Sequence, residues 1–299
     1  MLLVEPSYEI QDDLDRMPLP QALEARGRIC YKSEERIGAG TAEPFLSRIA
    51  ASGHGSVLEM GVVTAEISCS AEDKAALFAG QPRFLMVDET EAGLLITASV
   101  RAPREAASNA VVAALAHALA EKYPFLFAGV SLPETALFQP RFLSVDEVDA
   151  LPQALLLRHR FLGVKFAVSR AVSHELVRHR VCSFLQESQR YCNYGQARFG
   201  QHVAFVRPVF YAEDSPEFTC WKKSMEEAEA AYLRLLATSS PQAARTVLPN
   251  SCKTEIIVYC NLAEWRHIFK LRTTSAAEPS MREVMLPLAA DFKARYPFI

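Results

Sequence analysis

The chain has 299 residues, of which half are hydrophobic and 22% are charged, and its formal net charge is −3. This composition is typical of a globular protein with a substantial core, and it argues against a protein that coats nucleic acid through bulk positive charge. Seven cysteines without a CxxC pair predict reduced thiols. The N-terminus lacks signal-peptide features and no apolar run approaches the ~20 residues of a membrane span, so we expect a soluble, cytoplasmic protein with no membrane partner.

The first half of the chain predicts three strands and two helices. Residues 63–70 alternate between apolar and polar side chains, which indicates a half-buried strand, and 94–99 predicts a second strand. The alanine-rich segment 104–123 predicts a helix. Alternation returns around 164–168, and helical character follows over 169–180.

The second half predicts mainly helices around one buried strand at 254–260. Asn261 stands where an N-cap belongs, with Glu264 three residues later, so we expect a capped helix that runs to about Arg272. The other predicted helices lie at 222–238, from Ser240-Pro241, and from Pro279, and the last has an apolar stripe of Met281, Val284, Met285, Leu288 and Phe292.

This mixture of elements predicts an α+β fold, with a mixed or antiparallel sheet flanked by helices. No segment is rich enough in glycine and serine to be a flexible linker, so we expect a single domain over 1–299 with a helical insertion at about 101–160. The nonapeptide QPRFLMVDE at 81–89 recurs as QPRFLSVDE at 139–147, with Met86 replaced by Ser144. The repeat hints at a duplicated strand–helix unit.

The segment SHELVRHRVCSFLQESQRY at 173–191 concentrates cationic and hydrogen-bonding side chains. A zinc site is one interpretation, since HELVRH resembles the metalloprotease helix HExxH. However, His174 and His179 are five residues apart, which on a regular helix turns the second side chain ~140° from the first. We therefore predict no metal. Ser188 lacks the G-x-S-x-G elbow of hydrolases, which favours a serine that hydrogen-bonds a ligand or the backbone.

The arginines of this segment favour a small anionic ligand. Between Arg170 and Tyr191 four arginines and two glutamates give a formal sum of +2, which is modest for a surface that binds a phosphate backbone. Arginine forks onto single phosphates and stacks on planar rings, so a nucleotide fits better than a duplex. An RNA-binding module remains the alternative from another class. The tripeptide RHR also occurs at 158–160, so by itself it carries little information.

The second RHR is followed by seven residues and then a serine, and this RHR-x7-S pattern resembles the signature of flavin-dependent thymidylate synthases. Five blocks resemble that family in its order: CYKS at 30–33, SGHGSVLE at 52–59, SHELVRHR at 173–180, ARTVLPN at 244–250 and NLAEWRHIFKLR at 261–272.

The resemblance implies an enzyme, a methyltransferase that converts dUMP to dTMP with methylenetetrahydrofolate as one-carbon donor, FAD as cofactor and NADPH as reductant. It implies a homotetramer with active sites between subunits, and no nucleic-acid partner. It also implies site residues. For FAD these are Arg178, His179, Arg180, Gln186, Asn261, Leu262, Ala263 and His267. For dUMP they are Glu175, Arg178, Gln186, Ser188, Gln189, Arg190, Arg245 and Arg272, of which Arg272 and Ser188 are the catalytic candidates.

Two places depart from the family pattern, and one of them, SMRE at 280–283, stands where the family's last helix commonly reads EIR after an acidic residue. After GHGSVLE the family usually has a histidine, and this chain has Met60. Methionine packs against rings but carries no charge and donates no hydrogen bond. The alternative within the family is therefore a divergent member that binds flavin and a pyrimidine nucleotide but has a different or lost activity.

Overall fold

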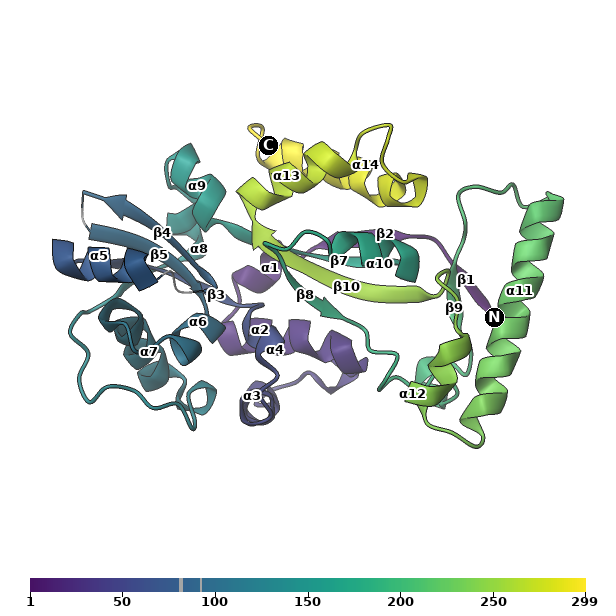
Figure 1. Cartoon of the computed structure of the whole chain (residues 1–299), viewed down its shortest axis with the longest axis horizontal. Coiled ribbons are helices and arrows are strands. Elements are labelled where there is room, and N and C mark those ends of the chain that lie inside the picture. Colours follow the sequence, from purple (N-terminus) through teal and green to yellow (C-terminus); the bar gives the residue numbers. More distant parts are fainter. Residues whose placement is uncertain (81–82, 92) are drawn as a thin grey trace.

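The computed structural model describes residues 1–80, 83–91 and 93–299, arranged as an elongated molecule built around two four-stranded sheets (Figure 1). The strands are β1 (Leu2–Val4), β2 (Ser7–Ile10), β3 (Val62–Ile67), β4 (Leu85–Thr90), β5 (Gly93–Ser99), β6 (Arg141–Leu143), β7 (Phe161–Ser169), β8 (Ser183–Gln186), β9 (Ala204–Val206) and β10 (Lys253–Asn261).

Helices cover both sheets and the far end of the molecule. They are α1 (Asp12–Asp15), α2 (Leu19–Gly27), α3 (Ala42–Ala51), α4 (Gly55–Leu58), α5 (Ala71–Gly80), α6 (Arg101–Glu105), α7 (Ala110–Lys122), α8 (Val145–Asp149), α9 (Gln153–His159), α10 (Arg170–Leu176), α11 (Pro216–Leu236), α12 (Pro241–Ala244), α13 (Leu262–Arg272) and α14 (Pro279–Arg295). Within the described ranges, none of these helices is both long and apolar enough to cross a membrane.

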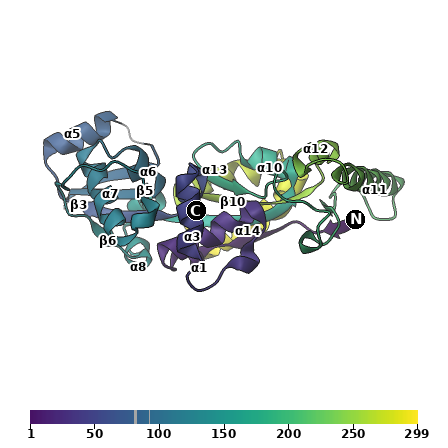
Figure 2. The same cartoon turned by 90° about the horizontal axis from the view of Figure 1, so that it is seen from below.

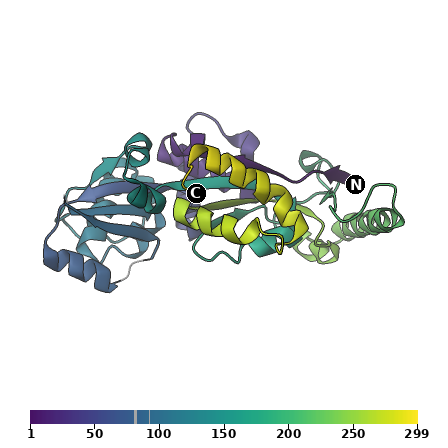
Figure 3. The same cartoon turned by 90° about the horizontal axis from the view of Figure 1, so that it is seen from above.

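The central sheet has the order β2-β7-β10-β8, and all of its neighbouring strands are antiparallel. Because side chains alternate along a strand, β10 buries Val258 on one face and Ile257 on the other. The first face packs against Trp265 of α13 and Phe292 of α14, and the second packs against Leu23 of α2 and its neighbours. Figure 3 shows α13 and α14 lying across the sheet. The central sheet is therefore buried between two helical layers.

The second sheet has the order β4-β5-β3-β6 and is also antiparallel. Ala65 and Ile96 on one of its faces form a core with Leu77 of α5 and Leu115 of α7, and Figure 2 shows this unit to one side of the central sheet. The α+β fold class is confirmed, but the chain forms two such sheets where the sequence indicated one. The boundaries of the insertion stay a prediction; the range 101–160 contains α6, α7, α8 and α9 together with β6.

The repeated nonapeptide forms the two opposite edges of this second sheet. Gln81 and Pro82 of the first copy lie outside the described residues, Arg83 and Phe84 form a turn, and the last five residues of that copy lie in β4, which pairs with β5. In the second copy β6 pairs with β3 and stops at Ser144, whose side chain accepts a hydrogen bond from the Glu147 amide in a capping box that begins α8. Met86 cannot cap a helix, and at that position the first copy continues as a strand.

Several predicted boundaries were wrong. The helix expected over 104–123 is divided, because Asn109 accepts hydrogen bonds from the amides of Val111 (3.0 Å) and Val112 (3.3 Å) and so begins a new helix, α7. The helix expected over 222–238 begins earlier, at Pro216 behind the N-cap Ser215, and ends at Leu236. The apolar stripe predicted for the last helix is buried throughout. All seven cysteines are free thiols, as expected.

Candidate active site

The RHR tripeptide lies in a turn at the end of α10, beside the central sheet. Ser169 caps the start of α10, and the helix ends at Leu176, four residues before the end of the predicted helical segment. The amides of Arg178 and His179 then bond to the carbonyls of Glu175 (3.2 Å) and Leu176 (3.1 Å), so the backbone turns away from the helix axis. His174 and His179 are therefore not on one helix.

Arg272, at the end of α13, is bonded to two other predicted site residues. Its Nε–H donates to Nε2 of His179 over 3.1 Å. Its Nη1 donates to the Glu175 carboxylate over 2.7 Å, and its Nη2 donates to the Glu175 carbonyl over 3.2 Å. Two segments far apart in the sequence are thus tied together at the edge of the sheet. We call Glu175, His179 and Arg272 the arginine cluster.

His179 is held as a neutral imidazole. Burial, with the nearby charges of Arg272 and His267, lowers its pKa to about 4. Since Nε2 accepts a hydrogen bond from Arg272, the ring proton is on Nδ1, which lies 3.8 Å from Oε1 of Glu264. Burial raises the pKa of Glu264. His267 stands edge-on to His179, with ring centroids 6.2 Å apart.

The ligand atoms of His179, Glu264 and His267 lie within 4.8 Å of one another, a spacing that a metal ion could use. The hydrogen bonds argue for a different description. Both nitrogens of His179 are occupied, one by the Arg272 donor and the other by the ring proton, so a cation would have to displace one of them. The group therefore fits a hydrogen-bonding site better than a metal centre.

The loop after β8 carries the other predicted residues. The Gln186 side chain donates to Ser173 (2.9 Å) and Thr254 (3.1 Å), so it joins α10, β8 and β10. The Ser188 hydroxyl accepts a hydrogen bond from the Arg190 amide over 3.3 Å. Gln189 Nε2 is buried and has no hydrogen-bond partner among the described residues. A buried amide without a partner is costly in a folded protein, which makes Gln189 a candidate for donation to a ligand.

The remaining predicted arginines are exposed. Arg178, Arg180, Arg190 and Arg245 form no ion pair with a carboxylate in the described part of the chain, whereas Arg272 does. The Arg190 guanidinium lies 5.4 Å from the Tyr191 ring centroid. The structure thus brings Glu175, His179 and Arg272 together within one chain, and in the described ranges no hydrogen bond or ion pair joins this cluster to Arg190 or Arg245.

The start of α13 is capped as predicted. Asn261 Oδ1 accepts from the Glu264 amide over 2.9 Å, and its Nδ2 donates to the Arg158 carbonyl over 3.0 Å. The Leu262 amide donates to the Arg160 carbonyl over 3.0 Å. Because these groups already have partners, the backbone amide of Ala263 is the one among the three predicted FAD residues here that is best placed to meet a ligand.

Two glutamates of the site were not predicted. Glu264 was interpreted only as part of a helix cap, although its spacing from His267 places both on one face of α13. Glu59 accepts a hydrogen bond from Ser183 over 2.7 Å and pairs with Arg101 over 2.5 Å, which connects α4 to β8. Met60, one of the two places that depart from the family pattern, is fully buried with Leu58 and Leu23.

Comparison with known proteins finds similarity in the part of the chain that contains the RHR turn and α13. Residues 156–298 match the family model described as thymidylate synthase complementing protein. A flavin-dependent thymidylate synthase of Pyrococcus furiosus is 36% identical over 128 residues, which are 42% of this chain and 52% of that protein. Those of Geobacter sulfurreducens and Corynebacterium aurimucosum are 32% identical over 158 residues and 35% identical over 148, covering 52% and 44% of this chain and 66% and 57% of the relatives. The chain thus spans about half to two thirds of the length of these relatives.

Proposed function

We propose that this chain is a flavin-dependent thymidylate synthase, because residues 156–298 match the thymidylate synthase complementing protein family and the relatives described above, which are named for this activity, are similar to it. The reaction is the reductive methylation of dUMP to dTMP, with methylenetetrahydrofolate as one-carbon donor and NADPH as reductant. The observation that carries the proposal is the arginine cluster, which joins the RHR turn to the end of α13 inside the segment that matches the family.

The residues present fit FAD. Arg178 and Arg180 supply two guanidinium groups on either side of the neutral His179, and arginine forks suit the anionic groups of a dinucleotide. His267 and the Ala263 amide add donors beside them, while Asn261, Leu262 and Gln186 hold the backbone through the bonds described above. When bound, the flavin supplies the redox chemistry, methylenetetrahydrofolate supplies the one-carbon unit, and the protein supplies position and electrostatics.

For dUMP we propose that Arg190 and Arg245 neutralise the phosphate, while Gln189, Ser188 and Arg272 meet the nucleoside. Arg272 is already bonded to His179 and Glu175, but a guanidinium has five N–H donors and three are used here. Two remain for the uracil ring. A fixed positive charge at that point stabilises negative charge that develops on the ring during reaction. Glu175 acts by orienting Arg272.

A homotetramer with active sites between subunits is part of the proposal. Its support is that, within the described part of one chain, no hydrogen bond or ion pair joins the arginine cluster to Arg190 or Arg245, the two arginines proposed for the phosphate. Val181, with 69% of its surface exposed, and Leu271, with 47% exposed, lie in the same two segments as Arg178 and Arg272. Exposed apolar side chains of this kind are typical of surfaces that another subunit covers. Analytical ultracentrifugation tests this directly, and a monomer that is nonetheless active would contradict it.

The test of the activity is an assay with dUMP, methylenetetrahydrofolate and NADPH, in which dTMP is quantified by chromatography. We expect a yellow protein that forms dTMP and loses this activity when dUMP is omitted. Oxidation of NADPH without any dTMP would instead identify the divergent, flavin-binding alternative. A colourless protein that binds no added FAD would refute both.

A further inference from the structure

A cavity of about 490 Å³ lies where the second sheet meets the central one. Its walls are mainly aromatic and aliphatic, and they come from both sides of this junction: Leu19, Tyr123, Phe142, Leu143, Phe161 and Tyr259. This volume is in the range of small-molecule sites, which occur preferentially where two structural units meet. None of the candidate active-site residues is among the described residues that line it.

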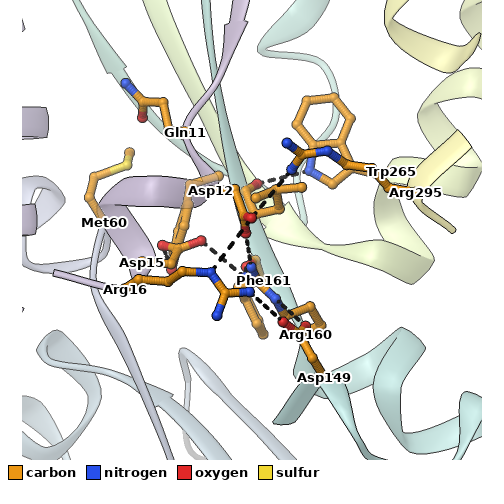
Figure 4. Close-up of polar contacts among 12 residues, drawn as sticks. Gln11, Asp12, Asp15, Arg16, Met60, Asp149, Arg160, Phe161, Trp265 and Arg295 are labelled. Carbon is orange, nitrogen blue, oxygen red and sulfur yellow. Dashed lines mark hydrogen bonds and ion pairs between the residues drawn. The ribbon is translucent and has the colours of Figure 1, made fainter. Parts of the chain in front are cut away.

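Most of the charged groups around the cavity are already neutralised. Figure 4 shows Arg160 bonded to Asp12, to Asp15 (3.0 Å) and to Asp149 (2.8 Å). Arg16 pairs with Asp149 as well, over 2.9 Å. Because these pairs link α1 to α8 and to the start of β7, they hold the two sides of the cavity together without needing a ligand.

Lys122 is different. It lies at the end of α7 among the residues that line the cavity, and its ammonium has no carboxylate partner in the ranges that the structure describes. Its Nζ lies 5.4 Å from the ring centroid of Tyr123, another lining residue, so the positive charge is held beside an aromatic wall. The mouth of the cavity therefore carries an uncompensated cation.

A chain of hydrogen bonds gives the cavity wall a defined polarity. Asp88 accepts from Nε of Arg158 (2.6 Å), so it is an ionised acceptor, and His159 Nε2 therefore carries the proton that it donates to Asp88 over 2.9 Å. His159 is neutral, since burial lowers its pKa. Its Nδ1 must then accept from Thr97 (2.9 Å), and Thr97 must accept from Thr64 (2.7 Å). Thr64 and His159 both line the cavity, and the chain leaves the Thr64 hydroxyl as an acceptor.

We propose that this cavity is a second ligand site, for a small amphipathic anion. The ligand has an aromatic or apolar body that packs between Tyr123, Phe142 and Phe161, an anionic group that meets Lys122, and an N–H or O–H group that donates to Thr64. The site is independent of the proposed function, because it uses neither the arginine cluster nor the exposed arginines.

Two fluorescent probes test the proposal on the full chain. Anilinonaphthalene sulfonate has a naphthalene body, an N–H donor and one negative charge, and N-phenyl-naphthylamine is the same molecule without the charge. We expect saturable binding of one sulfonate probe per chain. Lys122→Ala should raise the Kd of the sulfonate about tenfold, because a charge-assisted contact is lost, and should leave the Kd of the neutral probe unchanged. Thr64→Val should weaken both probes several-fold.

The matched control is Lys222→Ala, which removes an exposed lysine of α11, a helix that contributes none of the described residues lining the cavity, and should change neither Kd. Both probes should also bind in the presence of saturating FAD and dUMP, which separates this site from the candidate active site. Thermal unfolding of each variant confirms that it is folded. The proposal is wrong if the sulfonate keeps its affinity in Lys122→Ala, if FAD and dUMP displace both probes, or if no saturable binding occurs.

Discussion

Nε of Arg272 donates a hydrogen bond to Nε2 of His179 over 3.1 Å, although the two residues are 93 positions apart in the chain. This bond fixes the ring proton of His179 on Nδ1 and leaves the Arg272 guanidinium two free N–H groups. A functional group of the RHR turn and the proposed catalytic arginine therefore depend on each other. Each should be sensitive to replacement of the other.

Replacement of Arg272 tests its proposed catalytic role. We expect Arg272→Ala to lower kcat for dTMP formation, because the fixed charge beside the uracil ring is lost. The decrease should correspond to a loss of about 2–4 kcal/mol of transition-state stabilisation. Arg272→Lys should recover only part of this loss, since an ammonium cannot bond to His179 and Glu175 with the geometry of a planar fork. Lys270→Ala, on the exposed side of the same helix, is the control. An unchanged kcat in Arg272→Ala would remove its catalytic role.

The pKa of His179 predicts a dependence of stability on pH. It is about 4 in the folded protein and near 6.5 in an unfolded chain, so the unfolded state binds the proton first as the pH falls. The contribution of His179 to the free energy of unfolding is therefore complete above pH ~6.5 and is lost progressively as the pH falls towards ~4. Urea unfolding at several pH values measures this effect. As the pH falls from ~6.5 to ~4, the free energy of unfolding should decrease less in His179→Gln than in the wild type.

Nitrogen-detected NMR titration measures the protonation state and the tautomer of His179 directly. We expect His179 to remain neutral through pH 5 with its proton on Nδ1. A His179 ring that carried its proton on Nε2 would contradict the hydrogen bond from Arg272.

Asn261 is expected to matter for stability through its cap. Asn261→Ala removes the acceptor for the Glu264 amide and the donor to the Arg158 carbonyl, and should lower the free energy of unfolding by about 1–2 kcal/mol. Asn261→Asp keeps the acceptor and should lose less. Denaturant unfolding of the three proteins measures the difference. Equal stability of Asn261→Ala and wild type would show that the cap contributes little.

Replacement of Met60 by histidine, the residue usual in the family, is expected to destabilise the protein. Its side chain is fully buried with Leu58 and Leu23, so Met60→His places an imidazole in an apolar core and should cost about 1–3 kcal/mol of stability. Met60→Leu is the volume-matched control and should cost less than about 1.5 kcal/mol. If Met60→His is instead as stable as wild type and forms dTMP faster, then this position limits the reaction and its neighbours rearrange around the histidine.

The sequence predicted those elements for which capping residues and apolar periodicity indicate the same structure as the packing in the fold. The Asn261 cap and the stripe from Met281 to Phe292 are of this kind, because capping and helical periodicity are encoded within a few residues. The sequence did not predict that the helix over 104–123 is interrupted at Asn109. Alanine-rich segments on both sides of Asn109 favour a helix, and one capping residue is a weaker signal than their combined helix propensity. The second sheet was missed for a different reason: strand pairing joins residues distant in sequence, and no local pattern determines which strands become neighbours.

For the candidate site, the resemblance to a family assigned His179 to FAD and assigned Glu175 and Arg272 to dUMP, and the structure joins the three side chains by hydrogen bonds. The sequence could not give their geometry. The hydrogen bonds of Glu175 and the tautomer of His179 both depend on Arg272, which comes from another part of the chain. Glu264 was missed because a residue three positions after an N-cap has a sufficient structural explanation, and its second role depends on the position of the RHR turn.

The two near-identical nonapeptides at the edges of the second sheet allow the secondary structure of almost the same sequence to be compared at two places in one protein. Excised as synthetic peptides, Arg83–Glu89 and Arg141–Glu147 would give closely similar circular dichroism spectra, because they differ only by Met86 and Ser144. Inside the protein one is extended to its end and the other changes to a helix after three residues. The Ser144 hydroxyl, which caps α8 where β6 stops pairing, is the one side-chain difference within the shared peptide, and it marks the point at which the two shapes diverge.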